Sequence, residues 1–94
     1  MYIIAKGNSM LPTLKDGYMY KVEPVVDGRV YLNDIIVFQI GELVICHRVV
    51  KLVNTKKGYS FIKTKGDNCL EPDDFAVRTD MIIGKITEES LNII

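Results

Sequence analysis

The sequence lacks several features that would assign it to whole classes of proteins. None of its apolar runs approaches the ~18–20 residues that a membrane-spanning helix needs. Its 12 Lys and Arg residues are balanced by 12 Asp and Glu residues, so no excess of charge remains at pH 7. Nucleic-acid binders need surplus cations to neutralise phosphates. We therefore expect no nucleic-acid partner and no insertion into a membrane.

The N-terminus also lacks the charged leader and the long apolar centre of a secretory signal, which favours a cytoplasmic location. Cysteine and histidine are scarce, with two and one residues respectively. Cys46 and Cys69 are too few for a disulfide framework and match no zinc motif, so we interpret them as reduced thiols and leave a redox role open. A metal site containing Cys46, His47 and Cys69 is disfavoured, because neighbouring residues of a strand point to opposite faces. No metal or other cofactor is expected.

The apolar residues occur in short runs, many of them β-branched or aromatic, separated by Gly, Asn, Asp and Pro. This pattern is typical of strands, and 94 residues suffice for one domain covering residues 1–94. We expect a mainly β fold, a small, partly closed antiparallel barrel or sandwich. The predicted strands are residues 2–5, 18–22, 30–32, 34–40, 43–53, 59–64 and 81–86.

The clearest predicted hairpin joins residues 34–40 to residues 43–53. Gly41 and Glu42 match a two-residue turn with glycine in its first central position. Period-two alternation then places His47 on a face shared with apolar side chains, which suits a partly buried base. The turn sets the expected pairs, which are Ile40 with Leu43, Phe38 with Ile45 and Ile36 with His47.

The remaining segments have weaker signals. Residues 9–14 are expected to form a single helical turn, since Pro12 fits near the start of such a turn. Residues 54–58 read as a turn, and residues 66–74, which have no periodicity, read as a loop. The tail, residues 88–94, is expected to be a short helix or an added edge strand.

One serine, one histidine and a small acidic cluster are the components of nucleophilic hydrolysis. The Ser9 hydroxyl needs a neighbouring base to accept its proton, and His47 is the only histidine. A carboxylate on the other ring nitrogen would fix the tautomer of the imidazole. Asp67, Asp73 and Asp74 are the candidates, and Glu71 is a weaker one. Taken singly, these residues also fit a helix cap, a packed core histidine and solvated turns.

Five segments, in order, resemble conserved segments of type I signal peptidases. Residues 9–13 read Ser-Met-Leu-Pro-Thr, similar to the nucleophile segment Ser-Met-x-Pro-Thr of that family. The other four are Asn-Asp-Ile-Ile-Val-Phe (33–38), His-Arg-Val-Val (47–50), Thr-Lys-Gly-Asp-Asn followed by Asp-Asp (64–68 and 73–74), and Ile-Gly-Lys-Ile (83–86). Most bacterial members of this family have a lysine before Arg-Val-Val. The histidine at this position instead resembles the endoplasmic-reticulum and archaeal branch.

This resemblance implies a role for each matched residue. Ser9 would be the nucleophile, His47 the general base and Asp73 the acid that orients it, with Asp74 as the alternative acid. Asp67 would maintain the architecture of the site or act as a second acidic partner. The implied fold is the peptidase domain shared with self-cleaving SOS-type repressors.

The resemblance also implies how a substrate would bind. The protein would be a soluble serine endopeptidase with a Ser-His-Asp mechanism. A peptide or protein precursor would bind to it as an extended strand along an exposed edge and be cleaved after a small residue. Substrate and oxyanion contacts would come from Ser9, Gly7, Met10 and Pro12. Gly7 stands where many relatives have a serine that helps to stabilise the oxyanion, so the backbone N–H of Ser9 would be the chief donor. Such a donor can contribute ~3 kcal/mol, so a slow enzyme is expected.

Further departures leave alternatives open. Cys69 and Leu70 replace polar residues of the acidic segment, and the family's membrane anchor has no counterpart. A catalytically weak or inactive peptide-binding or regulatory module on the same fold is the alternative function. A self-cleaving regulator is disfavoured because no linker with a cleavage site is seen.

A serine–lysine pair is also disfavoured. Lys51 lies roughly 13 Å beyond His47 along a strand, and no motif supports the other lysines, Lys21, Lys63 and Lys65. The sequence does not predict the oligomeric state.

Overall fold

The strands form two antiparallel sheets in the computed structural model, which describes residues 1–54 and 60–91. The predicted turn at residues 54–58 falls almost wholly outside the described residues. A ribbon of β1 and β2 forms the smaller sheet, and the larger sheet has the strand order β6-β5-β4-β3-β7. The strands are β1 (Tyr2–Ile4), β2 (Met19–Lys21), β3 (Ile35–Ile40), β4 (Leu43–Asn54), β5 (Ser60–Lys65), β6 (Ala76–Val77) and β7 (Ile82–Ile86).

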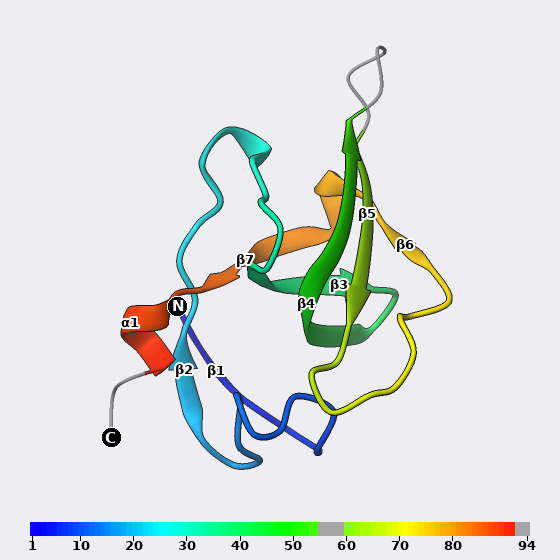
Figure 1. Cartoon of the computed structure of the whole chain (residues 1–94). Coiled ribbons are helices and arrows are strands. Elements are labelled where there is room, and N and C mark those ends of the chain that lie inside the picture. Colours follow the sequence, from blue (N-terminus) through cyan, green and yellow to red (C-terminus); the bar gives the residue numbers. More distant parts are fainter. Residues whose placement is uncertain (55–59, 92–94) are drawn as a thin grey trace.

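The larger sheet curls into a half-barrel, and the β1–β2 ribbon lies beside its open side (Figure 1). Irregularities in the pairing accompany this curvature, because an extra residue in a strand increases its local bend and twist. One lies between Val37 and Phe38 of β3, and another between Val49 and Lys51 of β4. The prediction of a mainly β, partly closed antiparallel fold is confirmed.

The β3–β4 hairpin has the predicted register. Its turn contains Gly41 with a φ of 59°, a left-handed conformation that glycine adopts without steric penalty. The three expected pairs are all present, including Ile36 opposite His47. The register matters for the site, because it determines which face of β4 carries the histidine.

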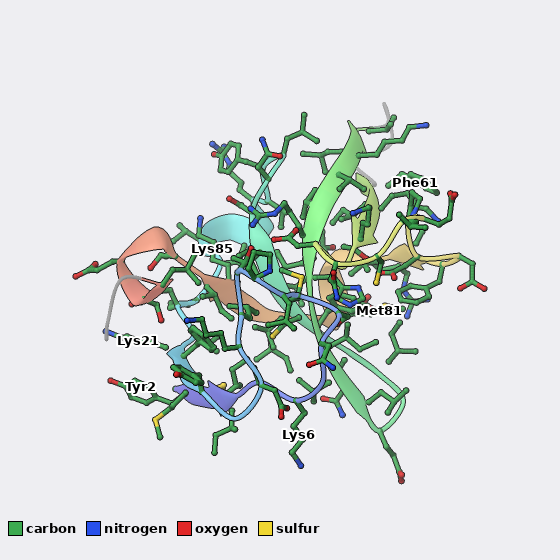
Figure 2. All side chains as sticks on the ribbon, turned by 60° about the horizontal axis from the view of Figure 1, so that its bottom comes forward. Tyr2, Lys6, Lys21, Phe61, Met81 and Lys85 are labelled. Carbon is green, nitrogen blue, oxygen red and sulfur yellow. The ribbon has the colours of Figure 1, made fainter. Side chains whose placement is uncertain are left out.

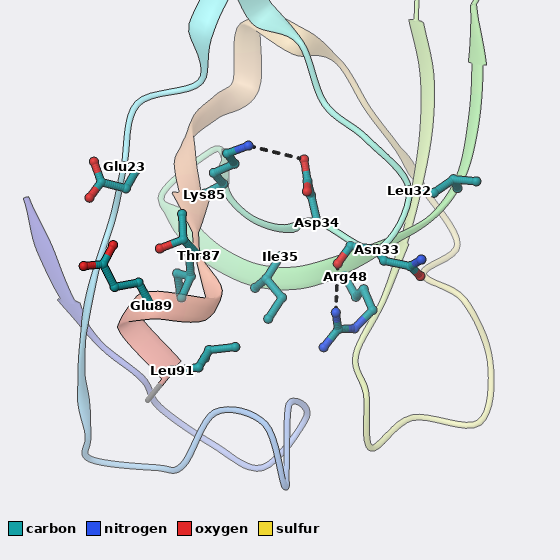
Figure 3. Close-up of a pocket in the computed structure, with 11 residues that line it drawn as sticks. Glu23, Leu32, Asn33, Asp34, Ile35, Arg48, Lys85, Thr87, Glu89 and Leu91 are labelled. Carbon is teal, nitrogen blue, oxygen red and sulfur yellow. Dashed lines mark hydrogen bonds and ion pairs between the residues drawn. The ribbon is translucent and has the colours of Figure 1, made fainter. Parts of the chain in front are cut away.

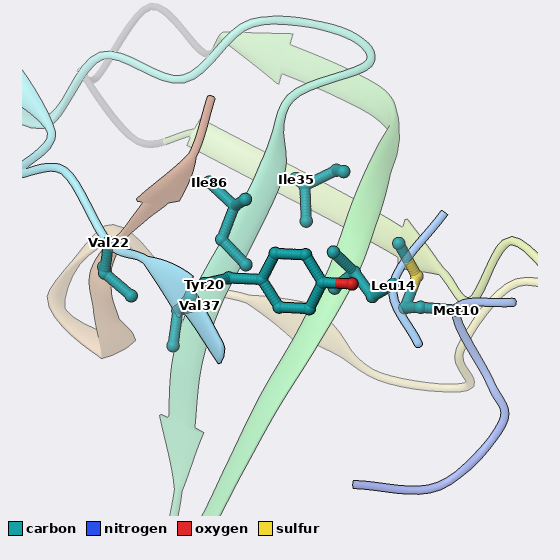
Figure 4. Close-up of a cluster of buried hydrophobic side chains, with 7 residues drawn as sticks. All are labelled: Met10, Leu14, Tyr20, Val22, Ile35, Val37 and Ile86. Carbon is teal, nitrogen blue, oxygen red and sulfur yellow. The ribbon is translucent and has the colours of Figure 1, made fainter. Parts of the chain in front are cut away.

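Two clusters of buried side chains form the core. The first lies between the β1–β2 ribbon and the larger sheet and includes Met10, Leu14 and Tyr20 (Figure 4). The second lies on the other side of β3 and contains Ile36 and Phe38, both fully buried. Because β3 contributes alternate side chains to the two clusters, it is buried on both faces and forms the centre of the molecule.

A close approach of two segments connects the ribbon to the edge of the larger sheet. A Cβ atom at Gly84 of β7 would lie 2.5 Å from the carbonyl oxygen of Glu23, so only glycine fits there without displacement. Glu23 and Lys85 exchange backbone hydrogen bonds of 2.8 and 2.9 Å across the same contact. This bridge holds the segment after β2 against β7 and sets the position of the ribbon.

The tail contains a helix, α1 (Glu88–Leu91), in agreement with one of the two predicted alternatives. The Ser90 hydroxyl accepts a hydrogen bond of 2.9 Å from the Lys21 backbone N–H, and Leu91 packs against the first core cluster. The tail residues 92–94 lie outside the described residues. No helix in the described part of the chain has the length and apolarity to cross a membrane.

Two local predictions are wrong. Residues 30–32 do not form a strand, because Val30 anchors an irregular connection in the second core cluster instead of pairing with a neighbour. Residues 9–14 form consecutive turns and no helix, with a cis peptide bond between Leu11 and Pro12. Three short elements had no clear pattern: β6 and the 3-10 helices Val26–Gly28 and Thr79–Met81.

Candidate active site

The predicted nucleophile lies in the turns that follow β1. The loop between β5 and β6 holds this segment from the side: the Asn68 backbone N–H donates to the Ser9 carbonyl oxygen at 2.8 Å. The side-chain amide of Asn68 donates to the Asn8 carbonyl oxygen at 3.1 Å. At the start of the segment, the Gly7 N–H donates to the Asp16 carboxylate at 2.8 Å. These hydrogen bonds hold the backbone around Ser9 in place, and the Ser9 hydroxyl faces β4.

The three residues Ser9, His47 and Asp73 form a continuous hydrogen-bonded chain. Nε2 of His47 lies 3.2 Å from the Ser9 hydroxyl oxygen, and Nδ1 lies 2.6 Å from an Asp73 carboxylate oxygen. The His47 and Asp73 side chains are only 12% and 14% exposed. Because a carboxylate only accepts hydrogen bonds, Nδ1 carries the hydrogen and the lone pair of Nε2 faces the serine hydroxyl. This is the arrangement that general-base activation of a serine requires.

The neighbouring strand β5 holds Asp73 in place. The Thr64 hydroxyl donates to the same Asp73 oxygen at 2.6 Å, and the Asp73 N–H donates to the Thr64 carbonyl oxygen at 2.8 Å. The Lys63 ammonium group donates to the backbone carbonyl oxygens of Asp73 and Phe75. The side chain and the backbone of the acid are therefore both attached to one strand.

The structure places Asp67 in a second polar cluster, and the idea that it partners His47 is wrong. Two nitrogens of Arg48 each donate to the Asp67 carboxylate at 2.8 Å, and the Thr13 hydroxyl donates to it at 2.6 Å. The hydrogen bonds from Arg48 are the main reason that the pKa of Asp67 lies below its usual range. A third Arg48 nitrogen donates to the Asn33 carbonyl oxygen. The cluster links β4, which carries the histidine, to the segment that carries the serine.

The other predicted site residues have mixed outcomes. Asp74 is exposed, and Asp73 occupies the position beside His47, so the alternative acid is wrong. Gly7 and Met10 line a groove beside Ser9. Pro12 is exposed and does not line this groove, so its predicted substrate contact is not supported.

Sequence reasoning missed the residues that support the two carboxylates. Two of them had a usable signal, because Arg48 directly follows His47 and Thr64 begins the acidic segment. The sequence suggests Lys63 only as an alternative base, whereas its ammonium group is bound to backbone carbonyl oxygens. Thr13 closes the matched Ser-Met-Leu-Pro-Thr segment, but the motif did not predict its contact with Asp67, which depends on the conformation of two loops.

A groove with a volume of about 760 Å³ runs beside Ser9 and His47. It lies between β1 with the residues that follow it and the first half of β4. Among the described residues that line it, Lys6 is the one lysine, arginine or acidic residue, and it projects outward from the body of the molecule (Figure 2). Ile3, Ala5 and Cys46 contribute to its lining and pack against the first core cluster. The groove is thus largely apolar and continuous with the core.

Cys46 adds a thiol to the groove, but burial keeps this thiol from ionising. Desolvation raises the pKa of its thiol to about 12, so the thiol stays protonated at neutral pH. Both cysteines are free and half-buried. Among residues 1–54 and 60–91, no three His, Cys, Asp or Glu side chains are grouped so that they could hold a metal ion.

A second cavity of about 640 Å³ lies near α1 and is lined by charged side chains (Figure 3). Lys85 lies 3.8 Å from Asp34 on its wall. Arg48 also borders this cavity, so its guanidinium group lies between the cavity and the Asp67 cluster. Ser9, His47 and Asp73 do not line it.

The comparisons with known proteins give no family assignment. A scan against models of known protein families and a search of curated proteins both found no match for this chain. The chemical interpretation of the site therefore depends on its geometry and on the short motifs.

Replacing Gly66 should disturb the Ser9 segment directly. A Cβ atom at Gly66 would lie 2.6 Å from the Ser9 carbonyl oxygen and 2.8 Å from the Cys69 sulfur. Because the first of these neighbours is backbone, Gly66→Ala should displace the Ser9 segment and lower the free energy of unfolding by ~1–3 kcal/mol. Urea unfolding measures this loss. Asn68→Asp, which keeps the backbone bond to Ser9, is the control and should cost less. A neutral or stabilising Gly66→Ala would contradict the close packing of these segments.

The Asp67 cluster should make stability depend on pH in the acid range. Arg48 lowers the pKa of Asp67 in the folded state. The stabilisation that ionised Asp67 gives to the folded state is therefore complete above the unfolded pKa of about 3.9 and is lost as the pH falls through the lower folded pKa. Asp67→Asn should therefore lower the free energy of unfolding by about 2 kcal/mol near pH 7, with a smaller difference below about pH 4.

Urea unfolding of both proteins over this pH range measures the difference. Asp80→Asn is the matched control, because the Arg78–Asp80 pair is about 70% exposed and should contribute little. A difference between wild type and Asp67→Asn that stays constant down to pH 3 would contradict the assignment.

Proposed function

We propose that this protein is a serine endopeptidase that uses Ser9, His47 and Asp73. The observation that carries the proposal is the hydrogen-bonded chain from the Ser9 hydroxyl through His47 to Asp73, with distances of 3.2 and 2.6 Å, at the side of one groove. A serine–histidine contact alone also occurs in ordinary polar packing, but a buried carboxylate on the opposite ring nitrogen gives each group a defined role. The resemblance of five segments to type I signal peptidases points to the same chemistry.

The proposed reaction proceeds in two steps. The Ser9 oxygen attacks the peptide carbonyl carbon while Nε2 of His47 takes the hydroxyl proton, and Asp73 stabilises the resulting imidazolium. The Ser9 backbone N–H is assigned to the developing oxyanion. His47 then gives its proton to the amine that leaves, which breaks the peptide bond and produces an acyl-serine. Water, deprotonated by His47, hydrolyses this ester and restores the serine.

The strand pairing supports an extended substrate. In the described structure, β1 pairs only with β2, and β4 pairs with β5 only from Arg48 onward. The stretch of β4 before Arg48 therefore has one edge that no described strand occupies, and this stretch and β1 both line the groove. A peptide lying between them would make main-chain hydrogen bonds to both sheets, which provides affinity without depending on its sequence.

The groove lining indicates which side chains the substrate should present. The parts that pack against the core, Ile3, Ala5 and Cys46, are apolar, and no carboxylate of the described residues lines the groove. Substrate side chains that point toward the core should therefore be apolar and uncharged. The resemblance to signal peptidases adds a small residue on the acyl side of the cleaved bond.

Gly7 favours a second candidate function, a weakly active or inactive peptide-binding module. In many members of the family that this chain resembles, a serine at this position has a hydroxyl that helps to stabilise the oxyanion. Gly7 has no side chain, and apart from its two chain neighbours no described residue has an atom within 4 Å of where its Cβ would be. With one donor fewer, the rate would be lower by a factor corresponding to ~3 kcal/mol.

Cleavage of a peptide library would test the proposal. The wild-type protein is incubated with a library of unstructured peptides, and mass spectrometry identifies any new termini. We expect cleavage after small residues. Ser9→Ala should reduce it by at least ~10³-fold, because the acyl-serine cannot form. The purified chain suffices for this experiment, since no metal or cofactor takes part in the proposed steps.

The matched control is Ser90→Ala, which removes a buried serine hydroxyl from the α1–β2 contact and leaves the groove unchanged. It should retain cleavage. Cleavage that persists in Ser9→Ala would exclude the serine mechanism. Binding of library peptides by wild type without any cleavage would favour the peptide-binding module.

A further inference from the structure

We infer that Thr64 is a positioning residue that selects the rotamer of Asp73 and, through it, the tautomer of His47. This inference rests on the proposed function for its kinetic consequence, but its structural consequence can be measured without a substrate. Among the described residues, no hydrogen bond joins Thr64 directly to Ser9 or His47. Its effect is therefore exerted through the carboxylate.

The geometry around one carboxylate oxygen carries the inference. Oδ2 of Asp73 accepts hydrogen bonds from both the Thr64 hydroxyl and Nδ1 of His47, each at 2.6 Å. Two donors that converge on one oxygen fix the side-chain torsions of the aspartate, because any rotation breaks both bonds. Bonds to a charged group are also the stronger class of protein hydrogen bonds. The threonine therefore holds in place the oxygen that binds the imidazole.

Thr64 is well suited to this task because it cannot turn away. Its side chain is completely buried, and it lies on β5 opposite Val49 of β4. A β-branched side chain has few accessible χ1 rotamers, so its hydroxyl direction is largely set by the strand. The backbone bond from the Asp73 N–H to the Thr64 carbonyl oxygen adds a second attachment.

Lys63 makes a separate contribution to the same support. Its ammonium group binds the backbone carbonyl oxygens of Asp73 and Phe75, so it holds the chain on which the carboxylate is carried. This leaves the orientation of the carboxylate itself to Thr64. Removing the threonine hydroxyl should therefore free the Asp73 side chain while its backbone stays in place.

The imidazole tautomer gives a direct test, because His47 is the only histidine in the chain. Long-range ¹H–¹⁵N spectra are recorded at an alkaline pH at which imidazoles are neutral. Wild type should show the Nδ1–H tautomer, and Asp73→Asn should lose this preference. Thr64→Val, which replaces the hydroxyl with a methyl group of similar size, should show a mixture of tautomers. Thr64→Ser, which keeps the hydroxyl, should resemble wild type.

Kinetics on a peptide selected from the library provide a second measurement. Thr64→Val should lower kcat about tenfold, with KM changed less than about twofold. Losing the outer hydrogen-bonding partner of a metal-ligating histidine or carboxylate has an effect of about this size. Thr64→Ser should restore most of the rate, and Thr79→Val, at an exposed position, should leave it unchanged. If Thr64→Val does not fold, Thr64→Ala takes its place in both measurements.

The outcomes separate the two proposals. A folded Thr64→Val protein with the wild-type tautomer would overturn the role of Thr64, whatever its activity. Equal losses of tautomer preference in Thr64→Ser and Thr64→Val would also overturn it, because the hydroxyl would not be the cause. Failure of wild type to cleave any peptide would overturn the endopeptidase, while the spectra would still decide the inference on Thr64.

Discussion

The hydrogen bond between Asp73 and Nδ1 of His47 is the interaction on which the candidate site depends. It determines the ring nitrogen that carries the hydrogen, and so makes the lone pair of Nε2 available to Ser9. Without it, the same side chains would form an ordinary polar cluster at the edge of a groove. The fold meets this requirement through the loop after β5, in which Asp73 reaches His47 of β4 and is attached to Thr64 of β5.

The regular part of this arrangement could be predicted from the sequence. The turn at Gly41 and the alternation of apolar residues determined the β3–β4 register, because a slip of one residue would exchange the two faces of β4. The short motifs supplied Ser9, His47 and Asp73 as candidates, and the structure places them within hydrogen-bonding distance of one another. Pattern and motif therefore sufficed for the longer strands and for the groups at the centre of the site.

The irregular part could not be predicted, for a physical reason. In a strand, the alternation of apolar and polar residues predicts the face of the sheet to which each side chain points. The loop after β5 has no such alternation, so its contacts are set by packing. The approach of Gly66 to Ser9 and the binding of Asp67 to Arg48 both depend on that loop. The ambiguity between Asp73 and Asp74 had the same origin, since adjacent acids in a loop differ only in how the chain turns. The structure resolves it by burying one and exposing the other.

The groove has a property that packing and stability alone do not account for. Edges of sheets that lack a partner expose hydrogen-bonding groups and invite association, and proteins usually protect them with charge, proline or a covering segment. Within residues 1–54 and 60–91, β1 and the first part of β4 leave such edges on the two sides of one groove, and Ile4 and Val44 on its lining are 57% and 53% exposed. A third extended segment would satisfy both edges and cover these side chains at once. Ser9 lines the same groove, so under the proposed function a segment paired with these edges would bring a peptide bond close to the Ser9 hydroxyl.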